Sequence, residues 1–175
     1  MTIMGCPAAG SYPPYYDTYF ETIDFNKDIK KSLDEATEKF LQLTTHLDIS
    51  QLQYAYAEGK WTVSQVLLHI ADCELIFNYR ICSILRDEKQ SLPGFDENVY
   101  AEKSKSLNYS LEKIVDYFVA VRELTKTQLL TTPIEKMNQT GIANANIISV
   151  KALYYIIIAH QLHHLYVIKE RYKIA

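Results

Sequence analysis

Two histidines, His160 and His164, are spaced four residues apart in a segment that is otherwise rich in apolar side chains. On a helix this spacing stacks both imidazoles on one face, about 6 Å apart at the backbone. Two imidazoles in this arrangement can occupy adjacent ligand positions of one metal ion. The spacing alone also fits hydrogen-bonded histidines in a helical core, so a further ligand is needed to favour a metal.

A third histidine, His69, strengthens the prediction of a metal site. It lies between Val66 and Cys73, beside the apolar stripe of another predicted helix. Burying imidazoles without partners costs about 1 to 3 kcal/mol for each unsatisfied polar group, whereas one cation satisfies a ring nitrogen on all three. Three protein ligands also leave coordination positions open, as catalytic sites require. The residues therefore predict one divalent metal ion on His69, His160 and His164.

Four more polar side chains are candidates for supporting the ligands or for binding substrate: Asp72, Arg80, Arg122 and His163. Asp72 can orient an imidazole through its second nitrogen, or lie at the surface. Arg80 and Arg122 fall on or beside interior stripes, where a guanidinium needs a carboxylate or an anionic ligand. We favour buried ion pairs with Glu74 or Asp72 over substrate contacts. His163 points about 100° away from His164, which favours a supporting or surface role.

Four amphipathic segments are predicted to position these side chains. The first helix is expected over about residues 26–47, where apolar residues recur at spacings of three and four. The second begins at the capping-box pattern Thr62–Gln65 and ends near Arg86. Ser110 caps a third helix that closes before Pro133, and a fourth covers about 149–172. Without a convincing alternating strand, the fold class is all-α, a four-helix bundle.

The depth of the histidines along their helices predicts the topology. His69 lies seven residues from the start of the second helix, and His164 lies eight from the end of the fourth. The two residues come level if these helices are antiparallel, whereas parallel helices would offset them by about 12 Å. An up-down-down-up order makes them antiparallel, with residues 87–108 as the crossover. Residues 91–108 and 131–148 are long enough to shape an entrance at the end of the bundle.

The remaining sequence limits domain count, partners and location. With 175 residues and 48% hydrophobic residues, we expect one domain, 1–175, whose first 25 residues form a proline- and tyrosine-rich arm packed over the bundle. The net charge of -3 and scattered basic residues argue against nucleic-acid binding. The longest apolar run is too short to cross a membrane. Three unpatterned cysteines and the absence of an export signal predict a cytoplasmic protein.

Six short motifs are distributed along the chain, and each occurs once: Tyr56–Val63, His69–Asp72, Tyr79–Arg80, Leu92–Asp96, Val121–Arg122 and His160–Leu165. In combination they resemble the DinB-like superfamily of metalloenzymes. The resemblance implies an up-down-down-up bundle, frequent homodimers, and a nickel or zinc ion on three histidines that correspond to His69, His160 and His164. It also implies kinship with bacillithiol transferases and mycothiol-dependent isomerases, in which the metal activates a low-molecular-weight thiol.

The leading hypothesis is a metal-dependent transferase, with a low-molecular-weight thiol as co-substrate, or a hydrolase, acting on a small molecule. In either case the ion would lower the pKa of a bound thiol or water. The residues assign neither a general acid nor a general base. One alternative is a non-catalytic, stress-associated metal-binding bundle whose ion serves stability. Another is a helical interaction module without an ion.

Overall fold

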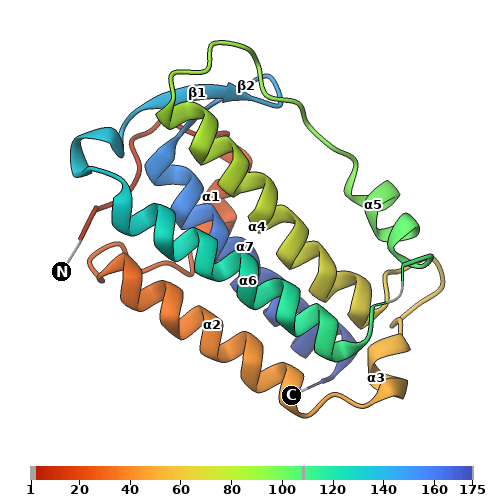
Figure 1. Ribbon diagram of the computed structural model, residues 1–175. Coiled ribbons are helices and arrows are strands. Elements are labelled where there is room, and N and C mark those ends of the chain that lie inside the picture. The colour runs from red at the N-terminus through yellow and green to blue at the C-terminus, as the bar shows by residue number, and fades with distance from the viewer. Residues whose placement is uncertain (1–2, 108, 175) are drawn as a thin grey trace.

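A computed structural model describes residues 3–107 and 109–174 (Figure 1). Within them, four long helices form the predicted bundle: α2 (Ile29–Thr45), α4 (Val63–Leu85), α6 (Leu111–Thr131) and α7 (Val150–Tyr172). In Figure 1, α2 and α7 run in one direction and α4 and α6 in the other, which confirms the up-down-down-up order. α4 packs against α6 and α7, and α2 packs against the same two helices on the other side. The two helices that carry the histidines are therefore antiparallel neighbours.

Side-chain caps set the starts of the long helices close to where the sequence predicts them. The Thr62 hydroxyl accepts a hydrogen bond from the backbone N–H of Gln65, and the Gln65 side chain accepts one from the Thr62 backbone, so the capping box is confirmed. The Ser110 and Ser149 hydroxyls cap α6 and α7 by accepting hydrogen bonds from the backbone N–H groups of Lys113 and Ala152. The first long helix is shorter than expected because Asp28, rather than a residue near 26, provides its cap.

The connections hold short elements that the sequence did not predict. α3 (Ile49–Gln53) follows the first long helix, and α5 (Glu97–Ser104) lies within the crossover. A short 3-10 helix (Ile134–Lys136) and an antiparallel hairpin, β1 (Thr140–Ala143) and β2 (Asn146–Ser149), follow α6. The expectation of no strand was therefore wrong, although the fold remains mainly helical.

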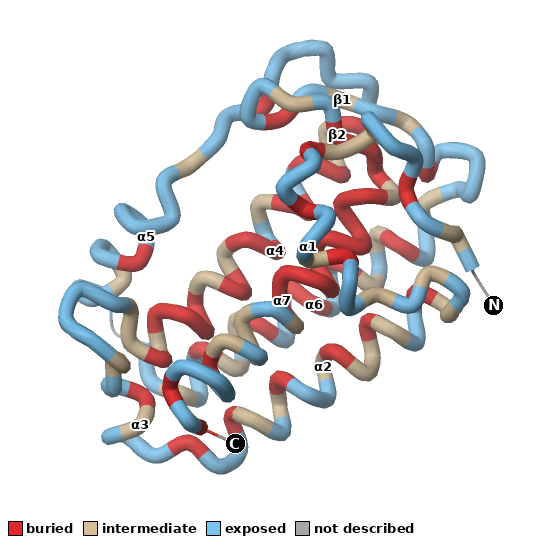
Figure 2. The backbone as a smooth tube through the Cα atoms, turned by 180° about the vertical axis from the view of Figure 1, so that it is seen from behind, coloured by how far each residue is buried: buried red, intermediate tan, exposed pale blue. Residues whose placement is uncertain are grey.

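The amino-terminal arm lies against the bundle, as expected, but it is not irregular throughout. It contains a 3-10 turn (Pro14–Tyr16) and the single-turn helix α1 (Asp17–Phe20), which packs on α7 (Figure 2). Proline at the first position of the turn has a backbone angle suited to a helical start. Tyr16 and Phe20 are buried, so the rings of the arm extend the core. No helix in the described ranges has the length and apolar character needed to span a bilayer.

A polar layer crosses the middle of the bundle and separates two apolar clusters. One cluster joins the start of α2 and of α7 to the end of α4, and the other joins the opposite ends of these helices. Between them lie Glu74, Arg122 and Gln161, all nearly inaccessible to solvent, and the imidazole of His160. The chemistry-bearing residues are therefore concentrated at one level of the fold.

Candidate metal centre

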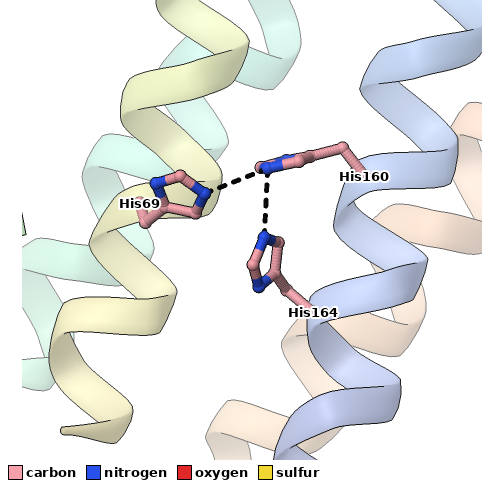
Figure 3. A group of neighbouring side chains, drawn as sticks. All are labelled: His69, His160 and His164. Atoms are coloured by element: carbon pink, nitrogen blue, oxygen red, sulfur yellow. Dashed lines mark hydrogen bonds between the residues drawn. The ribbon is translucent and has the colours of Figure 1, made fainter. Parts of the chain in front are cut away.

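The imidazoles of His69, His160 and His164 converge between α4 and α7 (Figure 3). The Nε2 atom of His160 lies 3.0 Å from Nε2 of His69 and 3.1 Å from Nε2 of His164. In a tetrahedral zinc site, bonds of about 2.0–2.1 Å separate two ligand nitrogens by about 3.3 Å. The ligand atoms of all three histidines lie within 4.8 Å of one another, so modest side-chain movements would bring all three to ligand distance from one ion.

The hydrogen-bonding capacity of imidazole explains why this cluster suits a cation. A neutral ring nitrogen either donates one proton or accepts one hydrogen bond. The Nε2 atom of His160 faces two other Nε2 atoms, so it cannot satisfy both of them. Three lone pairs directed at one cation remove this conflict. The donor set and its convergence therefore fit a divalent metal ion.

Burial keeps these imidazoles neutral at pH 7. It lowers the pKa of His69 to about 4, opposed weakly by the Glu97 carboxylate. Burial, with smaller contributions from His69 and His163, lowers the pKa of His164 to about 3. The pKa of His160 falls well below 6.5 because the ring is buried and lies beside other histidines, above all His164. A neutral imidazole presents the lone pair that a metal ligand requires.

Aromatic side chains hold the ligand rings in place. The ring centroid of Trp61 lies 4.8 Å from that of His69, and the Tyr172 hydroxyl donates a hydrogen bond to the Trp61 carbonyl over 2.7 Å. Tyr19 of α1 stacks over His160 at an interplanar angle of 16°. Both ends of the chain therefore contribute to the orientation of the imidazoles.

A cavity of about 370 Å³ opens onto the three histidines. The arm, the crossover segment, α4 and the hairpin form the wall of this cavity. Besides the three histidines, its lining residues are Tyr15, Tyr16, Tyr19, Trp61, Cys73, Phe77, Arg80, Gly94, Phe95, Glu97 and Asn144. Both long connections therefore contribute to the cavity as expected, although the cavity opens at the level of the histidines, between the two apolar clusters, and not at the end of the bundle. A larger groove of about 600 Å³ between α2 and α7 contains none of the three histidines. The chemistry therefore belongs to the smaller cavity.

Glu97 is a cavity residue that sequence reasoning missed. It is the first residue of α5, which Asp96 caps by accepting hydrogen bonds from two backbone N–H groups. The Gln65 side chain holds α5 against α4 by donating a hydrogen bond to the Ala101 carbonyl over 2.6 Å. The only sequence signal was its position directly after Leu92–Asp96, one of the motifs along the chain.

The structure separates the four supporting candidates. Asp72 is half-buried and accepts a hydrogen bond from the Tyr117 hydroxyl over 3.0 Å, so of the two alternatives for this residue the contact with an imidazole is not formed. Burial raises the pKa of Asp72, and the Tyr117 hydrogen bond opposes this shift. His163 is exposed and lies beside the ring of Tyr19, with 4.6 Å between centroids, which agrees with a surface role.

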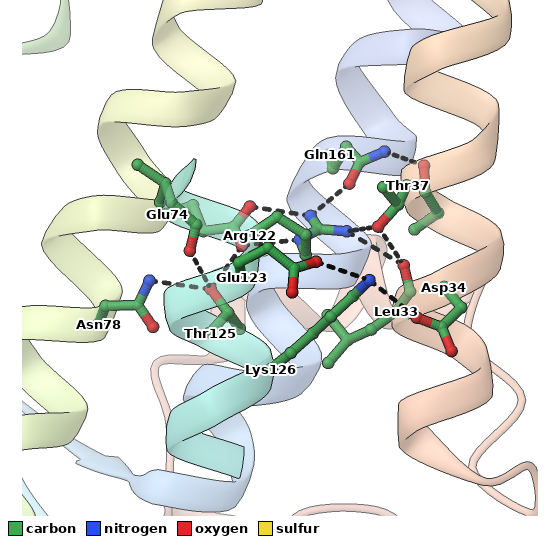
Figure 4. Close-up of polar contacts among 12 residues, drawn as sticks. Leu33, Asp34, Thr37, Glu74, Asn78, Arg122, Glu123, Thr125, Lys126 and Gln161 are labelled. Atoms are coloured by element: carbon green, nitrogen blue, oxygen red, sulfur yellow. Dashed lines mark hydrogen bonds and ion pairs between the residues drawn. The ribbon is translucent and has the colours of Figure 1, made fainter. Parts of the chain in front are cut away.

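The expected buried ion pair is confirmed for Arg122 (Figure 4). Its Nε and Nη2 atoms donate to the two carboxylate oxygens of Glu74 over 2.7 and 2.8 Å. Nη2 also donates to Gln161, and Nη1 donates to the Thr37 hydroxyl and the Leu33 carbonyl. This network ties all four long helices together at the level of the histidines. For Arg80, by contrast, the expected carboxylate partner is absent among the described residues.

A four-helix bundle of up-down-down-up order with three convergent histidines defines a class of bundle proteins equipped to hold a divalent metal. Residues 32–168 match the DinB superfamily, and this chain belongs to that family.

Two curated relatives and one solved structure are similar to the chain. "Putative metal-dependent hydrolase OB0413" of Oceanobacillus iheyensis is 26% identical over 140 residues, which are 79% of this chain and 80% of the relative. "Putative metal-dependent hydrolase YfiT" of Bacillus subtilis is 32% identical over 74 residues, 42% of each chain. The structure of YfiT, described as "a probable metal-dependent hydrolase with an unusual four-helix bundle topology", matches with a TM-score of 0.74. That match has 22% identity and covers 98% of this chain and 97% of the other, and it shows that the fold is shared.

Proposed function

We propose that this chain is a metal-dependent enzyme that holds one divalent ion, nickel or zinc, on His69, His160 and His164. Its reaction is hydrolysis of a small molecule or transfer of a low-molecular-weight thiol to one. The observation that carries the proposal is the convergence of three neutral Nε2 atoms at one point beside a cavity. The names of the two relatives, each of which reads "Putative metal-dependent hydrolase", support the hydrolytic branch.

The ion's contribution would be Lewis acidity, which lowers the pKa of a water or thiol bound to it and provides a nucleophile at neutral pH. The protein contributes the open side of the ligand set, since the three histidines come from two helices and leave the cavity side free. The rings of Tyr16, Tyr19 and Trp61 limit access of bulk water to this side.

Glu97 is the side chain best placed to move a proton. Its carboxylate lines the cavity with the histidines, and it acts on the pKa of His69 after the larger effect of burial. Carboxylates serve as general bases where they reach the reacting proton directly or through one water. Cys73 also lines the cavity, but burial raises the pKa of its thiol, so this side chain stays protonated and does not act as the nucleophile.

The alternative of a purely structural ion makes a different prediction for the ligands. The network around Arg122 joins all four long helices without using any of the three histidines. We therefore expect His69→Ala to stay folded and to lose the ion. Unfolding of His69→Ala under conditions in which the matched variant His163→Ala is folded would favour the structural alternative.

Activity of metal-loaded and chelator-treated protein tests the proposal. The two reactions to follow are hydrolysis of 4-nitrophenyl acetate and conjugation of cysteine to 1-chloro-2,4-dinitrobenzene. We expect zinc or nickel loading to accelerate at least one reaction, and His69→Ala to abolish the gain while His163→Ala retains it. Glu97→Gln should lower the rate without lowering the metal content. Equal rates for loaded and chelated protein would contradict the enzymatic proposal.

A further inference from the structure

Among the described residues, two arginines are buried, and their surroundings differ sharply. Arg122 is 0% exposed and is satisfied by the Glu74 carboxylate, two side-chain oxygens and a carbonyl. Arg80 is 6% exposed, and its Nη2 atom donates one hydrogen bond, over 3.1 Å, to the Pro93 carbonyl. The Nε atom of Arg80 is buried and has no hydrogen-bond partner in the described structure.

An arginine in this state lacks the compensation that burial of a charge requires. Arginine keeps its positive charge in proteins, so the cost of burying it must be offset by hydrogen-bond or charge partners. The Cζ atom of Arg80 lies 5.8 Å from the centre of the Phe77 ring, which offers weak compensation. No carboxylate of the described residues lies within ion-pair distance of it. The guanidinium therefore keeps unused N–H donors with which it can bind an oxyanion.

The unpaired guanidinium of Arg80 lies on the same helix face as a ligand of the metal centre. Arg80 lies on α4 eleven residues after His69, which is three helical turns along the same face and about 16 Å at the backbone. Side chains on a helix lean toward its amino terminus, so the guanidinium leans toward the histidines. Both side chains line the same 370 Å³ cavity, and Cys73 and Phe77 lie between them on α4.

We propose that Arg80 is the residue that binds the anionic group of the substrate, a carboxylate or a phosphate. The substrate is then an elongated small organic anion. Its charged end lies at Arg80, its apolar body lies against Tyr16 and Phe77, and its reacting end reaches the histidines. The role of the reacting end rests on the proposed function, whereas anion binding at Arg80 does not.

The segment that contacts Arg80 is itself fixed in place. The Leu92 backbone donates a hydrogen bond to the Ile142 carbonyl over 2.8 Å, and its carbonyl accepts one from the Asn144 N–H over 2.9 Å. These bonds anchor the crossover to the hairpin one residue before Pro93, whose carbonyl orients the guanidinium. The cation is thus held in position before any ligand arrives, which lowers the entropic cost of binding.

Calorimetric titration of the zinc-loaded full-length chain tests the proposal. The probes are 3-phenylpropanoate, phenyl phosphate and the neutral 3-phenylpropanamide. We expect wild type to bind at least one anion tenfold more tightly than the amide, and the stronger anion identifies the group that the site prefers. Arg80→Met should weaken that anion at least tenfold and leave the amide unchanged. Arg86→Met, which removes an exposed arginine from the end of the same helix, should bind all probes as wild type does.

A second variant, Arg80→Lys, separates the effect of charge from that of side-chain geometry. Thermal melting shows whether Arg80→Met is still stably folded. Lysine retains the charge but not the fork, so Arg80→Lys should keep part of the preference. Arg80→Met should melt at or above the wild-type temperature, because it removes a buried charge without a protein partner. The inference is overturned if wild type shows no preference for an anion, if Arg80→Met keeps the wild-type anion affinity, or if Arg80→Met melts far below wild type.

Repeating the titration with His69→Ala distinguishes failure of the proposed metal-dependent function from failure of anion binding at Arg80. An anion preference that depends on Arg80 in this variant supports anion binding even if the chain proves to bind no metal. Stoichiometric metal binding without an anion preference in wild type supports the metal site and overturns the role of Arg80.

Discussion

Glu74→Gln removes the carboxylate that neutralises Arg122 and keeps the size and shape of the side chain. The Arg122 guanidinium is 0% exposed, so the charge left behind cannot be solvated without rearrangement of the core. The amide nitrogen of Gln would also face a donor, since both Glu74 oxygens now accept from Arg122 and one accepts from the Thr125 hydroxyl. The substitution therefore creates an unpaired charge and a donor–donor contact at the same point.

The size of the effect follows from the burial of both partners. Removing one member of a buried ion pair costs about 3 to 5 kcal/mol, because the remaining charge is left uncompensated. For a domain of 150 to 250 residues, each kcal/mol lowers the melting temperature by about 2 to 4 °C. We therefore expect Glu74→Gln to melt about 6 to 20 °C below wild type.

Glu123→Gln is the matched control for this prediction. Glu123 pairs with Lys126 over 3.1 Å, but its side chain is 63% exposed. Exposed pairs contribute about 1 kcal/mol or less, so this variant should melt within a few degrees of wild type. Melting is followed by circular dichroism with metal-free protein at neutral pH. A Glu74→Gln variant that melts as close to wild type as Glu123→Gln does would refute the assignment of a stabilising buried pair.

Two further predictions concern pH and the crossover. Burial lowers the pKa of His69 to about 4 and that of His164 to about 3, so the unfolded chain binds more protons than the folded chain below about pH 6.5. The urea midpoint of metal-free protein should be flat above pH 7 and fall between pH 6.5 and 4, and less steeply in His69→Ala; a flat profile would count against buried neutral imidazoles. A Cβ atom at Gly94 would meet the Asn144 side chain, 2.8 Å from its Cγ, so Gly94→Ala should lower the melting temperature. Adding Asn144→Gly should restore it, since glycine also tolerates the positive φ of 49° there; failure of this rescue would contradict the close contact.

The long helices and the histidine cluster could be predicted because their determinants are local. Polar caps such as Thr62 and Ser149 mark helix starts, and apolar spacing marks the buried faces. Helices are rigid, so the distance of His69 and His164 from their helix ends was enough to predict which helices are antiparallel. The convergence of the three rings followed from that topology.

The elements that complete the cavity depend on contacts between distant segments. Glu97 enters the site because Gln65 on α4 holds α5 by its backbone, a contact between residues 36 positions apart. The hairpin turns at Asn144 and Ala145, both with positive φ, and alanine is not a residue that predicts such a turn. No periodicity in the sequence indicates either feature.

The partners of the two buried arginines could not be predicted from the sequence either. Arg80 and Arg122 both lie on interior stripes, so an ion pair was the reasonable expectation for each of them. Only the packing of α4 against α6 decides that Arg122, and not Arg80, meets Glu74. The difference between a satisfied and an unsatisfied guanidinium is a tertiary property.

Metal content and spectroscopy of the histidine cluster test the central claim most directly. Cobalt(II) should titrate untagged, chelator-treated protein with a sharp end point at one ion per chain, and the visible spectrum should be that of nitrogen ligands. Replacing His69, His160 or His164 by alanine should abolish this end point, while His163→Ala should retain it. A wild-type protein that takes up no cobalt, nickel or zinc at one equivalent, or an end point that survives loss of His160, would contradict the account.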